Sequence, residues 1–295
     1  MKINVGDRKI ELKENSLGWA KVLEIPIKIE VCEDSFLHIG ATPSPLSEKK
    51  APIFKIKGKP AIPASSFKGA LRHQLELLFI NNIEKFAEKF NIPDDKKDVL
   101  KPCIPSPNPT KAEQELLNLK MYRGKMEGKK YVGHCEIKVE EDKINVGDLG
   151  ICPVCYFMGA TGIMGFLRVG NFIMEGESDI INQTNIRIDR KTGTAAKGAK
   201  VEGEQVKPGS VFKGKIEVVL STPILEMQGI KFGDARKISD VVIDKWLEYW
   251  EEKNKEQKAK ILIEEILIPA IQNIRILGGQ KSRGAGKVSV SILSE

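Results

Sequence analysis

The sequence has no long apolar run, few aromatic residues (6%) and only three histidines. No stretch reaches the roughly 18 apolar residues that a membrane span needs, and the first ten residues lack the apolar run of a secretory signal. We therefore expect a cytoplasmic protein without membrane association. The five cysteines are odd in number and mostly far apart, which favours a metal site or free thiols over a disulfide framework.

The chain has 295 residues, of which 41% are hydrophobic and 29% are charged. This composition is enough to bury a sizeable core, and it excludes a disordered chain, a collagen-like repeat and a disulfide-stapled miniprotein. The formal net charge of +7 points to a polyanionic partner only if the basic residues converge on one face.

Hydrophobic periodicity predicts a small set of elements. Alternating apolar residues predict strands, and apolar residues at helical spacing predict helices, the first of them with Ser65 or Ser66 as its N-cap. We expect strands at 21–30, 166–174, 211–220 and 287–292, helices at 63–80 and 241–276, and a long hairpin near 185–204. Strand, helix, two strands, helix, strand is the order of an α+β, ferredoxin-like (RRM-like) core, an architecture that also occurs in RNA-recognition domains.

The most specific local motif is Cys152-Pro-Val-Cys155, whose two thiolates can face one tetrahedral ion. Cys103, His134 and Cys135 are the candidates for the remaining ligands. In an extended segment His134 and Cys135 point to opposite sides, so only one of them would bind. The alternatives are ordinary buried cysteines and a redox pair. A redox pair should open a helix, whereas glycines follow this motif. Four protein ligands predict a structural zinc.

The loop Leu277–Val288 (LGGQKSRGAGKV) differs from a phosphate-binding P-loop. Ala285 stands where lysine should follow the second glycine, and the loop runs from helix to strand rather than the reverse. What remains is a glycine-rich backbone that carries Lys281, Ser282 and Arg283, a combination suited to holding a polyanion. The alternative is a plain turn that needs glycine for its positive φ angles.

Other basic positions also suggest phosphate binding. Lys68 lies in the first turn of the predicted helix at 63–80, with Arg72 one turn later, and a bound anion would offset the unfavourable helix dipole there. A basic stretch near 186–200 contains Arg187, Arg190 and Lys191. Both features are also compatible with solvated side chains. Because aromatic residues are few, we expect the backbone of a nucleic acid to be bound rather than its bases.

Few residues suggest catalysis, since no nucleophile motif such as GxSxG is present. His38, with Asp34 and Glu48 nearby in the sequence, is a candidate for acid–base chemistry on a ribose 2′-hydroxyl. A packing or ligand-contacting histidine is the alternative.

Five motifs occur in order along the chain: HIG at 38–40, IPASSFKGALR at 62–72, CPVCYFMG at 152–159, IRIDRKTGTA at 186–195 and LGGQKSRGAGKV at 277–288. Together they resemble the RAMP superfamily of CRISPR-associated proteins, and within it the repeated backbone subunit of type III effector complexes of the Csm and Cmr kinds.

This resemblance implies one RAMP domain over residues 1–295, with a ferredoxin-like core, a zinc-bearing lid inserted at about 91–160 and a β-hairpin thumb at 180–207. It implies a filament of copies along CRISPR RNA, contacts with complementary target RNA and other CRISPR-associated subunits, and a role in antiviral defence. The implied RNA-binding residues are His38, Lys50, Ser65, Ser66, Lys68, Arg72, Arg187, Arg190, Lys191, Lys281, Ser282 and Arg283.

The sequence departs from this family at one position. Relatives that cut target RNA carry an aspartate two residues before a Pro-aliphatic pair, whereas Lys50 precedes Pro52-Ile53 here. We therefore expect a non-catalytic RNA-binding scaffold, and a lysine at this position would hold phosphate. The rival interpretations are a metal-dependent endoribonuclease acting on target or precursor RNA, and a zinc-stabilised protein without a nucleic-acid role.

Overall fold

Strand β4 (Ala20–Val31) is the longest strand of the central sheet, and its alternating isoleucines are completely buried. It pairs antiparallel with β15 (Val211–Ser221) on one side and with β18 (Val288–Ile292) on the other. The computed structural model describes residues 1–42, 51–140, 143–177, 179–250 and 255–294. The strands expected at 21–30, 211–220 and 287–292 are confirmed.

The eight-stranded sheet has the order β18-β4-β15-β12-β6-β5, with β3 added to β4 and β11 added to β15. The strand expected at 166–174 is two short strands, separated by Gly170 and Asn171, that both pair with β15. The additional strands of this sheet are β3 (Lys13–Leu17), β5 (Lys55–Ile56), β6 (Lys59–Ile62), β11 (Leu167–Val169) and β12 (Phe172–Met174). The fold is therefore α+β.

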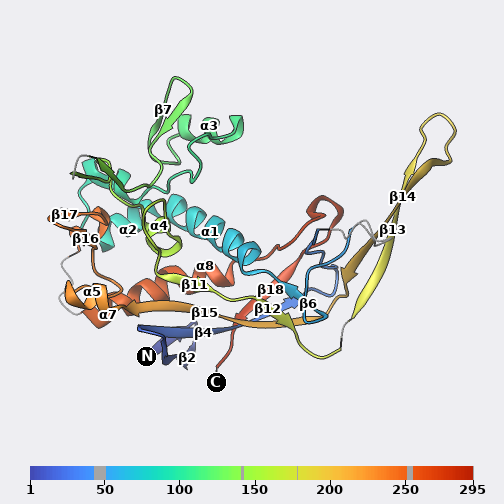
Figure 1. Cartoon of the computed structure of the whole chain (residues 1–295), viewed down its shortest axis with the longest axis horizontal. Helices are drawn as coiled ribbons and strands as arrows, with labels where there is room; N and C mark the ends of the chain where they lie inside the picture. The colour runs from blue at the N-terminus through green and yellow to red at the C-terminus, as the bar shows by residue number, and fades with distance from the viewer. Residues whose placement is uncertain (43–50, 141–142, 178, 251–254, 295) are drawn as a thin grey trace.

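Helix α1 (Ala64–Asn81) lies on one face of this sheet and buries Phe67, Leu71 and Leu75 (Figure 1). The predicted serine N-cap is wrong, because the helix begins after Pro63 and no side chain of its own sequence caps it. Instead, the Asn171 side chain accepts a hydrogen bond from the Ala64 N–H at 2.8 Å. This distant side chain satisfies one of the amide groups that every helix leaves free at its start.

The helix expected at 241–276 is divided. Helix α6 (Lys245–Glu248) is separate, whereas α7 (Lys255–Ile261), a π-helical segment (Leu262–Leu267) and α8 (Ile268–Gln272) follow one another directly. Pro269 lies in the first turn of α8 and has no N–H to donate backward. The wider π turn before it accommodates that missing donor, so the proline does not end the helical segment.

The described residues between 91 and 160 pack over α1, and most of their buried apolar side chains share one core with it (Figure 1). The remaining helices and small strands of the described residues are α2 (Ile83–Lys89), η1 (Asp94–Leu100), α3 (Lys111–Asn118), β7 (Lys125–Glu127), β8 (Lys130–Val132), β9 (Lys138–Glu140), β10 (Lys143–Asn145), α4 (Pro153–Met158), β1 (Lys2–Val5), β2 (Arg8–Glu11), α5 (Pro223–Met227), β16 (Lys237–Ile238), β17 (Val241–Val242) and η3 (Lys281–Arg283). No helix within the described ranges combines the length and hydrophobicity that crossing a membrane requires.

The strands β13 (Ile180–Ile188) and β14 (Ala195–Val206) pair as a hairpin that projects from the body of the molecule (Figure 1). The base of this hairpin is fixed through a backbone bridge between Val206 and Leu37 to the first loop, which connects β4 to β5 and is described at residues 32–42 and 51–54. The hairpin and the layer that carries α3 and β7 therefore stand on either side of a concave surface, with α1 between them.

Candidate nucleic-acid interface and metal centre

A groove of about 790 Å³ lies where three segments distant in sequence meet. These segments are the first loop at Ile39 and Gly40, the N-terminal half of α1, and the stretch that leads into the glycine-rich loop (Gly278–Gly286). The polar side chains that line it are Ser65, Ser66, His73, Gln74, Asn273, Arg275 and Lys281. The structure thus brings together three of the predicted binding residues, Ser65, Ser66 and Lys281, in one groove.

The glycine-rich loop is held against the first loop by backbone contacts. The Gly279 N–H donates to the His38 carbonyl at 2.8 Å, and the Gly286 N–H donates to the Phe36 carbonyl at 2.7 Å. Gly278 has a φ of +80°, and a Cβ atom there would lie only 2.4 Å from the His38 carbonyl oxygen. Only glycine permits both this backbone conformation and this close approach.

Between these two anchors the loop turns outward. Gln280 and Gly284 both adopt left-handed backbone angles, and the short 3₁₀ turn η3 (Lys281–Arg283) lies between them. This geometry leaves the side chains of Lys281, Ser282 and Arg283 exposed. Two cations on a fixed backbone are suited to contacting phosphate groups.

His38 is buried below the groove, with 8% of its surface exposed. Its Nδ1 lies 2.8 Å from the Glu204 carbonyl oxygen in β14, so the imidazole joins the first loop to the hairpin. Asp34 is exposed, and its hydrogen bond with the Lys287 ammonium lowers the pKa of the carboxyl group. The two candidates therefore have separate partners, while Glu48 and Lys50 lie outside the described residues.

The remaining predicted cations do not line the groove. Lys68 is half-buried on α1 and is absent from the lining, although Ser65 and Ser66 of the same turn belong to it. Arg190 and Lys191 are exposed at the far end of the hairpin, beside a turn in which Asp189 accepts the Lys191 N–H at 2.7 Å. The side chain of Arg187 lies outside the described part of the chain.

The sequence analysis missed His73, Gln74, Asn273 and Arg275, which also line the groove. The spacing of Ser66, Ala70 and His73 along α1 places them on one face of the helix, so a search for polar and small residues at helical spacing would have found His73. Asn273 and Arg275 follow α8 and carry no comparable signal.

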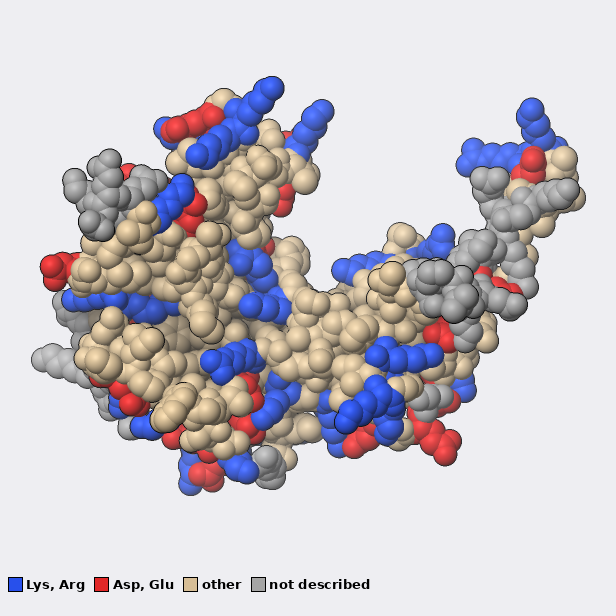
Figure 2. All heavy atoms as spheres, in the orientation of Figure 1, with Lys and Arg blue, Asp and Glu red and all other residues tan. Residues whose placement is uncertain are grey.

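Lysine and arginine side chains are visible on the floor of the concave surface and at the outer ends of both projecting parts (Figure 2). Acidic side chains are interspersed among them, which agrees with the moderate net charge of +7. In this view lysine and arginine side chains also lie over the lower part of the molecule, so the positive charge is not confined to the concave surface.

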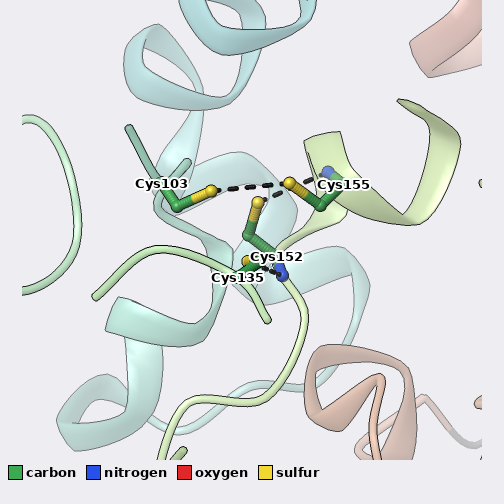
Figure 3. A group of neighbouring side chains, drawn as sticks. All are labelled: Cys103, Cys135, Cys152 and Cys155. Carbon is green, nitrogen blue, oxygen red and sulfur yellow. Dashed lines mark hydrogen bonds between the residues drawn. The ribbon is translucent and has the colours of Figure 1, made fainter. Parts of the chain in front are cut away.

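A second constellation lies beside Arg72 of α1. Cys103, Cys135, Cys152 and Cys155 are buried, and their four sulfur atoms all lie within 4.8 Å of one another. The side chains come from three separate parts of the chain and point toward a common centre (Figure 3). Sulfurs around a tetrahedral zinc, each at about 2.3 Å from it, stand about 3.8 Å apart. The donor set and its spacing therefore fit a tetrahedral metal ion.

His134, the other ligand candidate, is not part of this group. Its Nε2 lies 3.1 Å from the Glu136 carboxylate, whereas the neighbouring Cys135 sulfur accepts the Cys152 N–H at 3.1 Å. The expectation that only one of the two adjacent residues faces the cysteines agrees with this geometry, and the residue that does so is Cys135.

The expectation that no helix follows Cys152 is wrong. Helix α4 begins at Pro153 with Cys152 as its N-cap, whose sulfur accepts the Cys155 N–H at 3.4 Å. Proline is favoured in the first helical position, and this preference outweighed the glycines that follow Met158. The motif does open a helix, so the metal interpretation rests on Cys103 and Cys135 rather than on the argument against a helix.

Two guanidinium groups lie beside the sulfurs. Arg72 Nη2 is 3.5 Å from the Cys155 sulfur, and Arg123 Nη1 is 3.3 Å from the Cys135 sulfur. Burial alone would lower the pKa of Arg72, but the sulfurs of Cys155 and Cys103 raise it. Four thiolates around one divalent cation would carry a net charge of 2−. The Arg123 guanidinium lies beside the sulfurs, while Arg72 is shared between them and the Glu76 carboxylate, which accepts from Arg72 Nε at 2.9 Å. The structure therefore places Arg72 at the cysteine group rather than at the groove.

Comparison with protein families gives a match to the RAMP superfamily over residues 32–289. A comparison with curated proteins gives no match. The matched range includes the first loop, α1, all four clustered cysteines, the hairpin and the glycine-rich loop. The chain therefore belongs to the RAMP superfamily of CRISPR-associated proteins.

Proposed function

We propose that the protein is a CRISPR RNA-binding backbone subunit of a type III interference complex, which holds the guide RNA and stacks in copies along it in antiviral defence. The observation that carries this proposal is the groove in which the first loop, α1 and the glycine-rich loop meet beside Lys281. Membership of the RAMP superfamily agrees with it. In this role complementary target RNA and other CRISPR-associated subunits are the further partners.

The core in this proposal is ferredoxin-like. Its four strands are β4, β12, β15 and β18 in chain order, and their antiparallel order in the sheet is fourth, first, third, second. A split βαβ arrangement has this strand order. The segment 91–160 then acts as the inserted lid, and the hairpin of β13 and β14 acts as the thumb of a single domain.

The proposed cofactor is one structural zinc ion bound by the four clustered cysteines. Four protein ligands leave no open position for water, so the ion would supply stability rather than catalysis. In this arrangement Cys135 connects the segment after β8 to α4, while Cys103 connects the segment after η1 to the same centre. The zinc thus holds the lid together over α1.

RNA binding tests the proposal directly. The wild-type chain is expected to bind single-stranded RNA, and the affinity measured by fluorescence anisotropy should fall steeply as salt is raised, because phosphate contacts release counterions. Replacing Lys281 with glutamate should lower the affinity roughly tenfold at about 0.1 M salt and reduce the slope of log K against log salt by about one.

Lys231→Glu is the matched control for this measurement, because Lys231 is also exposed but follows α5, at the end of the molecule away from the hairpin. Equal losses in the two variants would show that net charge alone governs binding and would contradict the proposed groove. Stacking along RNA is tested separately by native mass measurement, in which doubling the RNA length should double the number of bound copies.

A further inference from the structure

Phe36 lies at the inner edge of the first loop, beside the glycine-rich loop. Its neighbours Ser35, Leu37 and His38 are 1%, 0% and 8% exposed, whereas Phe36 itself is 39% exposed. Burying an aromatic ring is strongly favourable, so a ring that a well-packed segment leaves in solvent is available to a ligand. Among the described residues, Phe36 makes no ring-to-ring contact of its own.

The backbone of Phe36 is fixed in place. Its carbonyl accepts the Gly286 N–H at 2.7 Å, and the preceding Ser35 hydroxyl donates to the Gly284 carbonyl at 2.9 Å. The same hydroxyl accepts the Lys287 N–H at 3.1 Å. The backbone of Phe36 is therefore held beside the segment that carries Lys281 and Arg283.

The glycine-rich loop to which the Phe36 backbone is bonded carries cations and is open at Gly284. The exposed η3 turn (Lys281–Arg283) precedes Gly284, and Lys287, which follows the loop, pairs with the Asp34 carboxylate. A Cβ atom on Gly284 would meet no atom of the described residues within 4 Å, so among them the loop is open at this position. An aromatic face next to phosphate-binding cations is the arrangement with which proteins hold single-stranded nucleic acids.

We propose that Phe36 is a stacking platform for one unpaired nucleobase of the RNA strand whose phosphates the glycine-rich loop contacts. This inference rests on the proposed function and adds to it a contact with a base, which the low aromatic content of the sequence gave no reason to expect. One such ring in each copy would position one base per subunit without reading its identity, since every base has a π-face.

The test compares two RNA probes of equal length, an oligoadenylate 12-mer and a 12-mer of abasic ribose–phosphate units. Phe36→Ala should weaken oligoadenylate binding by about 5- to 150-fold, the range measured for loss of one stacked base, and leave binding of the abasic strand unchanged. Phe36→Trp should retain the preference for oligoadenylate. Trp19→Ala, which removes an aromatic side chain that is 89% exposed elsewhere, should change neither affinity.

Two outcomes would overturn the stacking platform. If Phe36→Ala lowers the affinity for both probes equally, the ring has a purely structural role. If it lowers neither affinity, the ring has no role in binding. In both of these cases the wild type still binds RNA and the proposed function stands. A wild-type chain that binds neither probe at low salt would overturn both the platform and the proposed function.

Discussion

Replacing Cys152 with serine is expected to abolish zinc binding and to lower the free energy of unfolding by at least about 3 kcal/mol. The loss has two sources: the metal no longer joins three chain segments, and the buried Arg123 guanidinium loses the negative charge beside it, whereas Arg72 keeps its ion pair with Glu76. For a chain of this size the melting temperature should fall by roughly 6–12 °C. Zinc content by elemental analysis and thermal unfolding check this prediction.

Cys32→Ser is the matched control, because Cys32 is a free cysteine that lies outside the group of four. It should leave one zinc per chain and an unchanged melting temperature. Strong chelation of the wild type should reproduce the effect of Cys152→Ser, and hydrogen exchange should then rise first within residues 91–160. A wild-type chain that holds no zinc, or a Cys152→Ser variant as stable as the Cys32→Ser variant, would contradict the structural zinc.

Replacing Gly278 with alanine is expected to displace the glycine-rich loop and to weaken RNA binding by more than about tenfold, beyond the loss expected from Lys281→Glu. The added Cβ atom would lie 2.4 Å from the His38 carbonyl oxygen, so the loop must move away from the first loop. That movement breaks the hydrogen bond from Gly279 to His38 and separates two walls of the groove. RNA affinity and thermal unfolding measured on the same preparation check this prediction.

Gly284→Ala provides a control in the same loop. Gly284 has a φ of +81°, almost the same as the +80° of Gly278, but a Cβ atom there would meet nothing within 4 Å. Both variants carry the cost of a left-handed alanine, about 1 kcal/mol, so the difference between them isolates the close approach to His38. If the two variants bind RNA equally well, the contact between the glycine-rich loop and the first loop does not shape the groove.

The core strands and α1 could be predicted because their signals are local. The alternation of isoleucines in β4 and the spacing of Leu71 and Leu75 in α1 follow directly from burial on one face. The start of α1 could not be predicted in the same way, since the group that caps it is Asn171, more than a hundred residues later. Local sequence cannot reveal a helix cap that is provided by a residue brought close only by tertiary structure.

The candidate sites likewise combine features that local sequence predicts with features that depend on tertiary structure. The Cys152–Cys155 pair indicated a metal centre, but the sequence could not choose among Cys103, His134 and Cys135, because that choice depends on how residues 91–160 fold over α1. Arg72 was predicted to contact RNA on the basis of its helical position. Its actual surroundings are set by α4, which packs the Cys155 sulfur against it.

The base of the β13–β14 hairpin is anchored to the first loop, to Lys55 of β5 and to the glycine-rich loop. Glu204 accepts from the Ile53 N–H and from Lys55 at 3.2 Å, its carbonyl contacts His38, and Gln205 donates to Gln280 at 2.9 Å. A neighbouring molecule that displaces the hairpin tip would therefore disturb, at the hairpin's base, contacts with both the first loop and the glycine-rich loop.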